Sequence, residues 1–175
     1  MSLRITTPFD CDAVRSLKCG DKVLISGKIY TARDAAHKRM VQTITMGEEL
    51  PFDIKNQIIY YAGPTPAKPG KVIGSCGPTT SCRMDAYAPL LIGMGLTGMI
   101  GKGERSAEVV DAMKEFGCVY FGAIGGAGAL IAESVQSAQV VAYEDLGTEA
   151  IRCLTVKDFP AIVAIDCTGN SLFDR

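Results

Sequence analysis

The stretch VLISGKIYTARDAAHKRMVQTITM, from Val23 to Met46, contains the change of pattern that decides the fold. Its first part, Val23 to Tyr30, is apolar and β-branched around Ser26-Gly27, which is typical of two short strands joined by a turn. From Thr31 onward apolar side chains recur every fourth residue, and one apolar stripe at that spacing predicts a helix over Thr31 to Met46. The chain therefore passes from a strand into a helix at this point.

The same alternation continues along the rest of the chain. Apolar runs bounded by glycine predict strands, and apolar residues at helical spacing predict helices. The expected strands are Gln57 to Ala62, Val72 to Cys76, Cys118 to Ala123, Gln139 to Tyr143, Ile151 to Val156 and Ala161 to Ile165, and the further helices are Ser106 to Phe116 and Gly126 to Ser134. This order is typical of an α/β domain with a mixed, largely buried sheet. A length of 175 residues suits one domain, so we expect residues 1–175 to form a single unit.

Composition and charge exclude several classes of protein. Apolar residues make up 47% of the chain and charged residues 21%, values that exclude a disordered or fibrous class. Eighteen Lys plus Arg against 19 Asp plus Glu leave a net charge of -1, so we expect neither a nucleic-acid nor a membrane partner. The first nine residues lack the apolar run of a secretory signal, and we therefore expect a cytoplasmic protein.

The seven cysteines are scattered along the chain, and their odd number favours free thiols over a disulfide framework. None of them forms a C-x-x-C pair, the tight spacing that is usual in zinc and iron–sulfur loops. We expect this chain to hold no metal of its own.

Three turns place a cation among small residues, where strands end and helix N-termini favour bound anions. The first runs from Tyr30 to His37 (YTARDAAH), with Arg33 in the first turn of the expected helix. A solvated helix start is one interpretation of Arg33, since arginine is usually exposed. The other is a bound anion, which would offset the unfavourable position of a cation at that end of the helix dipole. We expect His37, the one histidine, to satisfy a local hydrogen bond.

The second turn is GSCGPTTSCRMD, from Gly74 to Asp85. Thr79 and Arg83 are four residues apart and would share one face of a helix that begins there, which would place a hydroxyl beside a forked carboxylate ligand. Thr79 could equally be a helix cap, because serine and threonine are favoured at that position. The residues alone leave both interpretations open.

The third turn, GMIGKGER from Gly98 to Arg105, holds Lys102 between two glycines. Such a lysine is either solvated or a positioned point charge. Gly93 to Gly98 also fits the G-x-G-x-x-G pattern of dinucleotide-binding loops, although the context of strand, turn and helix is missing. A dinucleotide- or phosphate-binding regulatory domain is therefore an alternative function.

Five collinear segments together resemble the β subunit of class I, iron–sulfur fumarate hydratases and of L(+)-tartrate dehydratases. The resemblance covers nearly the whole chain. The segments are ISGKIYTARDAAHKR (Ile25 to Arg39), GPTTSCRMD (Gly77 to Asp85), GMIGKG (Gly98 to Gly103), GGAGAL (Gly125 to Leu130) and DFPAIVAIDCTGNSLF (Asp158 to Phe173).

This resemblance implies a swivelling β/β/α domain, like the mobile domain of aconitase, that closes over a [4Fe–4S] cluster held by a separate α subunit. It implies a hydro-lyase that reversibly hydrates fumarate to malate, with L(+)-tartrate dehydration as the alternative reaction. The implied partners are the α subunit and a C4 dicarboxylate, and the implied assembly is a homo-oligomer of αβ units. Activity would require the α subunit, because the cluster would not be bound by this chain.

Carried over position by position, the resemblance implies that Arg33 and Arg83 bind the substrate carboxylates and that Lys102 adds a third cation. Thr79 would transfer the proton at the substrate carbon, and Thr79 and Arg83 would form the catalytic pair. These residue types suit the reaction, because hydration of a dicarboxylate builds negative charge on the carboxylate next to a developing carbanion.

Overall fold

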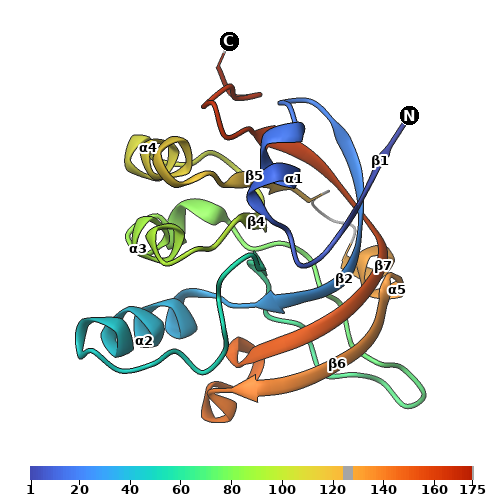
Figure 1. Ribbon diagram of the computed structural model, residues 1–175. Helices are drawn as coiled ribbons and strands as arrows, with labels where there is room; N and C mark the ends of the chain where they lie inside the picture. Colours follow the sequence, from blue (N-terminus) through green and yellow to red (C-terminus); the bar gives the residue numbers. More distant parts are fainter. Residues whose placement is uncertain (124–127, 175) are drawn as a thin grey trace.

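A single sheet closed into a barrel organises the chain (Figure 1). The computed structural model describes residues 1–123 and 128–174. Its seven-stranded sheet has the order β1-β2-β3-β4-β5-β7-β6, and β2 also pairs with β7. That additional pairing closes β2, β3, β4, β5 and β7 into a five-stranded barrel, which β1 and β6 extend beside β2 and β7.

The strands are β1 (Leu3–Thr6), β2 (Lys22–Thr31), β3 (Ile58–Tyr60), β4 (Gly98–Gly101), β5 (Val119–Gly122), β6 (Val135–Ala142) and β7 (Ile151–Ile165). The helices are α1 (Cys11–Ser16), α2 (Asp34–Thr45), α3 (Ala88–Gly93), α4 (Ala107–Phe116) and α5 (Gly128–Glu133), with 3₁₀ helices η1 (Ser81–Met84) and η2 (Glu144–Glu149). Among the described helices, none has the length and apolarity needed to cross a bilayer.

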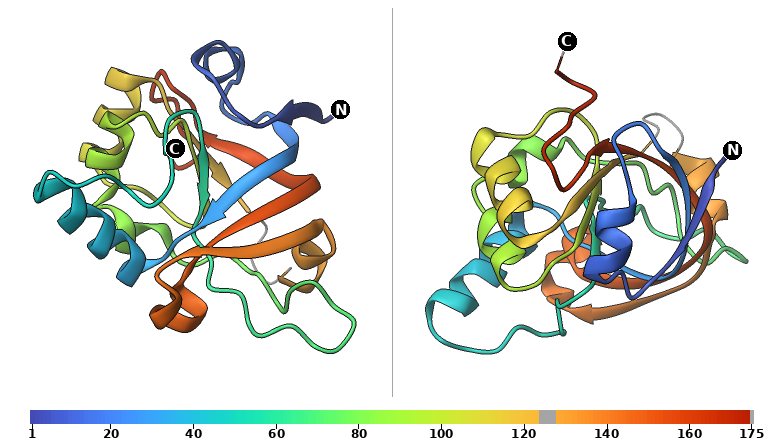
Figure 2. Two further views of the ribbon diagram at one scale, coloured as in Figure 1. Left: turned by 60° about the horizontal axis from the view of Figure 1, so that its bottom comes forward. Right: turned by 45° about the horizontal axis from the view of Figure 1, so that its top comes forward.

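The first five strands run parallel to one another, and β7 runs antiparallel to each of its neighbours β2, β5 and β6. Helices α2, α3 and α4 lie side by side against one side of the barrel, and they stay together in all three views (Figures 1 and 2). Because β2, β3 and β4 are parallel, the turns that follow them leave the sheet at a common edge.

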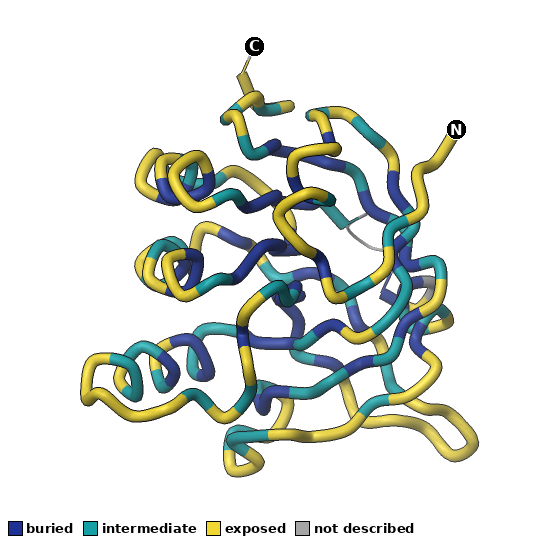
Figure 3. Tube along the Cα trace, viewed as in Figure 1, coloured by how far each residue is buried: buried dark blue, intermediate teal, exposed yellow. Residues whose placement is uncertain are grey.

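Alternate residues of each strand face two separate cores. On β3, Ile58 and Tyr60 belong to the core inside the barrel, whereas Ile59 belongs to the core between the barrel and the three helices. Ile100 and Met99 of β4 divide between the two cores in the same way. The dark central strands in Figure 3 are buried on both faces, as the period of two in a covered sheet requires.

Much of this architecture agrees with the sequence predictions. The predicted α/β class and the mixed, largely buried sheet are confirmed, as are the helices at α2 and α4 and the strands at β3 and β5. The predicted helix from Gly126 to Ser134 corresponds to α5, and its positions 126 and 127 lie outside the described residues.

Three predictions about strands were wrong. Val23 to Tyr30 is one strand and not a hairpin, and Ile151 to Val156 and Ala161 to Ile165 are parts of the single strand β7. Val72 to Cys76 forms no strand and belongs to a loop, fastened where the Thr65 N–H donates to the Ser75 carbonyl at 3.0 Å. The Gly74 N–H donates to the Thr65 carbonyl at 3.2 Å and the Ser75 N–H to the Thr65 hydroxyl at 2.8 Å, so this loop bonds to itself where a strand would bond to the sheet. Its residues 65–72 are all exposed (Figure 3).

The breaks that we predicted within β2 and within β7 face each other in the sheet. Both result from one irregularity in the pairing of these two strands. Between Ile25 and Gly27 the register with β7 shifts, and the facing Asp158 has a positive φ of 53°. The Asp158 N–H donates to the Ser26 hydroxyl at 3.0 Å, which satisfies a backbone group that the ladder leaves free. A glycine in a strand therefore marks a bulge here and not a turn.

Gly27→Ala should destabilise the protein by roughly 1–3 kcal/mol. Gly27 has a φ of 111°, and a Cβ atom there would lie 3.2 Å from both the N and the O atom of Thr7 as well as against its hydroxyl. Urea unfolding of the variant measures the loss, and Lys28→Ala, at the exposed next position, is the control. Equal unfolding free energies for the two variants would contradict a strained bulge.

Candidate functional site

The three cation-bearing turns meet at one edge of the sheet. Arg33 follows β2 and Lys102 follows β4 directly. The loop after β3 returns to the same edge, where the Thr79 N–H donates to the Tyr61 carbonyl at 2.7 Å. Thr80 then forms a parallel bridge with Lys102, and the Ser81 N–H donates to the Lys102 carbonyl at 2.9 Å. Main-chain contacts therefore bring the predicted site residues together.

Arg33 occupies the N-cap position of α2 but makes no capping hydrogen bond with its side chain. Its side chain lies against Gly63, where a Cβ atom would stand 2.8 Å from the Arg33 Cδ and 3.0 Å from its Nη1. Its Nε is buried and has no hydrogen-bond partner among the described residues. A buried donor without a partner costs about 1–3 kcal/mol, so the interpretation of Arg33 as a simple solvated helix start does not fit.

Arg83 is held by an ion pair that the sequence analysis did not foresee. Its Nε donates to Asp34 Oδ2 at 2.9 Å, which joins η1 to the start of α2. The side chain is half exposed, and the terminal Nη atoms of the guanidinium are not used in this pair. Those two groups can bind a carboxylate end-on. No local pattern signals this pair, because Asp34 and Arg83 are 49 residues apart in the sequence.

Thr79 is not a helix cap. The 3₁₀ helix η1 begins at Ser81 with Thr80 at its N-cap position, and Thr80 makes no capping bond with its side chain. Thr79 therefore lies before the helix, and the predicted shared helical face of Thr79 and Arg83 does not exist. The loop and its main-chain contacts, and not helical spacing, place both residues at the edge of the sheet.

Lys102 is exposed, between two glycines that have different roles. Gly101 is buried, and a Cβ atom there would overlap the Ser81 hydroxyl and lie 2.9 Å from the Tyr61 ring. Gly103 has a φ of 85°, a backbone conformation that glycine adopts without strain. Because Gly101 has no side chain, Ser81 can approach closely enough for its N–H to bond to the Lys102 carbonyl. This bond fixes the main chain from which the Lys102 side chain extends.

Arg105 is a buried cation behind this edge that the sequence analysis did not single out. Its side chain has 0% exposure, and its Nε donates to Asp85 Oδ1 at 2.7 Å. The guanidinium also lies over the rings of Tyr61 and Tyr120, 5.1 Å and 4.8 Å from their centroids. Burial alone would lower the pKa of Arg105, but Tyr61, Asp85 and Tyr120 outweigh it and raise the pKa. Arg105 is therefore a permanent positive charge.

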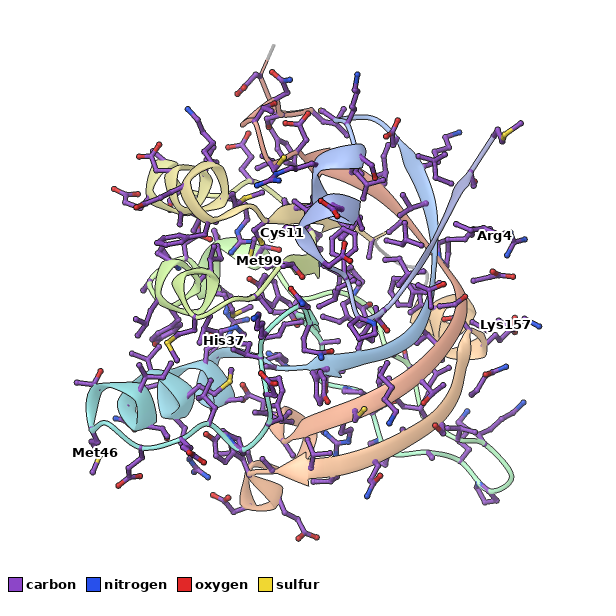
Figure 4. The ribbon with its side chains drawn as sticks, in the orientation of Figure 1. Arg4, Cys11, His37, Met46, Met99 and Lys157 are labelled. Atoms are coloured by element: carbon purple, nitrogen blue, oxygen red, sulfur yellow. The ribbon has the colours of Figure 1, made fainter. Side chains whose placement is uncertain are left out.

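His37 satisfies the local hydrogen bond that we expected. Its Nδ1 lies 2.8 Å from the Arg33 carbonyl oxygen, and because that oxygen only accepts, Nδ1 carries the proton. The ring packs edge-on to Tyr61 with a centroid distance of 5.3 Å, between α2 and the sheet (Figure 4). Complete burial lowers the pKa of His37 from 6.5 to about 4, against the raising effect of the Arg33 carbonyl. The neutral ring thus braces the turn that carries Arg33.

The alternative of a dinucleotide loop at Gly93 to Gly98 was wrong. Gly93 ends α3 and Gly98 begins β4, so the glycines join a helix to a following strand. A dinucleotide loop needs the reverse order, in which a helix N-terminus faces the pyrophosphate.

The described residues offer few ligands for a metal. Within residues 1–123 and 128–174, no three side chains of His, Cys, Asp or Glu lie close enough to hold a metal ion. The seven cysteines are free and are distributed between buried and exposed positions. The described residues therefore do not fit an iron–sulfur cluster.

Comparison with known proteins shows the family of this chain. The family model described as "Fumarase C-terminus" matches residues 2–175. The chain belongs to this family. It is 43% identical over 156 residues to "Fumarate hydratase class I, anaerobic" of Escherichia coli K12, which covers 88% of this chain and 28% of that protein. The chain thus spans little more than a quarter of this class I fumarate hydratase.

A second relative is of similar length to this chain. The chain is 41% identical over 168 residues to a Methanocaldococcus jannaschii protein named "Putative L(+)-tartrate dehydratase subunit beta", which covers 93% of this chain and 86% of the relative. A Geobacillus stearothermophilus relative named as a class I fumarate hydratase is 37% identical over 177 residues, or 34% of its own length. The relatives of this family member are thus named as hydro-lyases.

Acidification should destabilise the protein through His37. The unfolded chain binds a proton at His37 below pH 6.5 and the folded chain only near pH 4, so the free energy of unfolding falls as the pH drops through this window. The expected loss between pH 7 and pH 4 is roughly 3 kcal/mol.

The measurement is urea unfolding at both pH values for the wild type and for His37→Asn, which keeps an N–H donor for the Arg33 carbonyl. The variant should lack this part of the pH dependence, while the carboxylates contribute equally to both proteins. An identical pH dependence in the two proteins would show that His37 takes up its proton in the folded state as easily as in the unfolded state.

Proposed function

We propose that this chain is the β subunit of an iron–sulfur hydro-lyase that reversibly hydrates fumarate to malate and is active only with an α subunit. The observation that carries the proposal is the gathering of Arg33, Arg83, Lys102 and Thr79 at one sheet edge, with the buried Nε of Arg33 unpartnered among the described residues. A dicarboxylate supplies two acceptor groups for such a set of cations. Membership of the fumarase C-terminus family supports the same reaction.

We place the [4Fe–4S] cluster on the α subunit, because the described residues of this chain offer no set of ligands for it. When bound there, the cluster would supply a Lewis acid for the substrate hydroxyl. The class I fumarate hydratase of Escherichia coli is about three times as long as this chain, which leaves room for a second part of the enzyme, and the Methanocaldococcus relative is itself named as a subunit. In this proposal the chain is a cytoplasmic, swivelling domain that closes over the cluster, within a homo-oligomer of αβ units.

The cations of this chain would bind and polarise the substrate. Arg83 presents its two terminal Nη groups to one carboxylate, because Asp34 already engages its Nε. Arg33 would contribute its guanidinium charge, and the exposed Lys102 would add a point charge. Negative charge that develops on a carboxylate in the transition state is stabilised by cations already held in place.

Thr79 would carry the proton at the substrate carbon. Its main chain is fixed by the bond from its N–H to the Tyr61 carbonyl, and its hydroxyl has no capping role that would compete. A hydroxyl is a very weak base near neutral pH, so this role requires a neighbouring carboxylate. In the proposal the α subunit supplies that carboxylate.

L(+)-tartrate dehydration is the second candidate reaction, and one observation favours it. The Methanocaldococcus relative named as a putative tartrate dehydratase β subunit is matched over 86% of its own length, whereas the class I fumarate hydratase of Escherichia coli is matched over 28%. Malate and L(+)-tartrate are both C4 dicarboxylates. In each, the hydroxyl leaves from the carbon next to the carbon that loses the proton. The same four residues would serve either one.

Reconstitution tests the proposal. The chain should co-purify with a second polypeptide that carries an oxygen-sensitive cluster, and the pair should dehydrate malate or L(+)-tartrate while the isolated chain does neither. The rate of each reaction, measured under anaerobic conditions with both substrates, distinguishes the two candidates. Turnover by the chain alone, free of metal, would contradict the two-subunit proposal.

Thr79→Ala should lower turnover of the reconstituted enzyme by roughly 10²–10⁴-fold, with little change in substrate affinity. Exchange of the substrate C3 hydrogen with deuterated solvent should fall in parallel. Thr80→Ala is the matched control, because Thr80 is the neighbouring exposed threonine and its hydroxyl caps nothing. If both variants turn over like the wild type, the proton is carried by another residue.

A further inference from the structure

A buried ion pair joins the turn that carries Lys102 to the loop that carries Arg83. Arg105, in the turn after β4, donates from Nε to Oδ1 of Asp85 at 2.7 Å, and Asp85 ends the η1 segment that carries Arg83. The other oxygen of Asp85 accepts the Ser106 N–H at 2.8 Å. One carboxylate thus receives two hydrogen bonds from the turn that begins with Lys102.

Arg105 also makes a contact at the end of strand β3. Its Nη2 lies 3.0 Å from the hydroxyl of Tyr61, the residue whose carbonyl receives the Thr79 N–H. Its Nη1 lies 3.4 Å from the sulfur of Met99, which Figure 4 labels on β4. The guanidinium lies over the rings of Tyr61 and Tyr120 and is closed off from solvent.

Tyr120 completes the connection. Its hydroxyl lies 2.8 Å from the Gly103 carbonyl and 2.8 Å from the Ser81 hydroxyl. The carbonyl can only accept, so Tyr120 donates to Gly103 and accepts from Ser81. A single phenol therefore bonds to the turn of Lys102 on one side and to the start of η1 on the other.

On the basis of the proposed function, we propose that Arg105 is a positioning residue for the hydro-lyase reaction. Through Asp85, Tyr61 and Tyr120 it locks the loop that carries Thr79 and Arg83 against the turn that carries Lys102. Arg105 touches none of these three residues in the contacts described above, and it acts by fixing the distances between them.

The chemistry of the network distinguishes a lock from a simple contribution to stability. A buried ion pair is often no more stabilising than apolar residues of the same volume, because both charges must lose their water. What a forked guanidinium adds is direction, since its donors leave in fixed directions within one plane. The bonds of Arg105 lead to Asp85, which ends the segment that carries Arg83, and to Tyr61, whose carbonyl accepts the Thr79 N–H.

Arg105→Lys tests the lock, because lysine keeps the charge and loses the planar fork. Amide hydrogen exchange in the full chain gives the local readout. The amides of Thr79 and Ser81, which bond across the loops to Tyr61 and Lys102, should exchange at least about tenfold faster, while that of Val163, bonded to the Asp21 carbonyl, keeps its rate. A general loss of stability would accelerate all three amides together and would overturn the proposal.

Tyr120→Phe is the second variant, and it removes only the hydroxyl between Ser81 and Gly103. It should show the same local pattern, and it decides the question if Arg105→Lys does not fold. Arg39→Lys is the matched control. Arg39 also pairs with an aspartate, Asp145, and lies over a tyrosine ring, but at an exposed place between α2 and η2. The Thr79 and Ser81 amides should keep their rates in this variant.

The activity of the reconstituted complex provides the functional readout. Arg105→Lys should lower kcat/KM by about 10²-fold, the usual effect of a small displacement of reacting groups, while Arg39→Lys keeps the wild-type value. Wild-type activity in Arg105→Lys would overturn the proposal. If the wild-type complex itself turns over neither malate nor tartrate, the proposed function fails, and the exchange rates alone then decide whether Arg105 locks the two loops.

Discussion

The antiparallel pairing of β2 with β7 is the contact on which the rest of the structure depends. From Lys22 to Thr31, β2 lies against β7 with one shift of register, and this pairing turns an open seven-stranded sheet into a closed barrel. Closure leaves β2 paired on both sides, with β3 along its other edge at Tyr30 and Thr31. The end of β2 is therefore fixed on two sides where it delivers Arg33 to the site.

The parallel order of β2, β3 and β4 then collects the site at one edge, and two close approaches make the collection possible. Arg33 can lie beside the end of β3 because Gly63 has no side chain, and Ser81 can reach the Lys102 carbonyl because Gly101 has none. His37 braces one turn with a neutral ring, and Arg105 joins the other two with a permanent charge. The site is thus supported by one uncharged and one charged buried group.

The sequence predicted the parts of this structure that local patterns control. The apolar stripe of α2 and the apolar run of β3 lie within single elements, and both were found near their predicted bounds. The closure of the barrel was not predictable, because it pairs Val23 with Ala161 and no local pattern specifies so distant a partner. The collinear motifs selected Arg33, Thr79, Arg83 and Lys102, and the structure brings these four to one edge. Asp34 and Arg105 were missed because each acts through a contact with a residue from another turn.

The frame of the site consists largely of main-chain hydrogen bonds, and this has a consequence for divergence within the family. The bonds from Thr79 to Tyr61, from Ser81 to Lys102 and from Ala32 to Tyr60 use only N–H and C=O groups, which any residue except proline provides. Side chains that project from such a frame can be exchanged during evolution while their points of attachment remain in place. Relatives named for fumarate and for tartrate are 43% and 41% identical to this chain. A frame of main-chain bonds allows substrate preference to change by local substitution without a new fold.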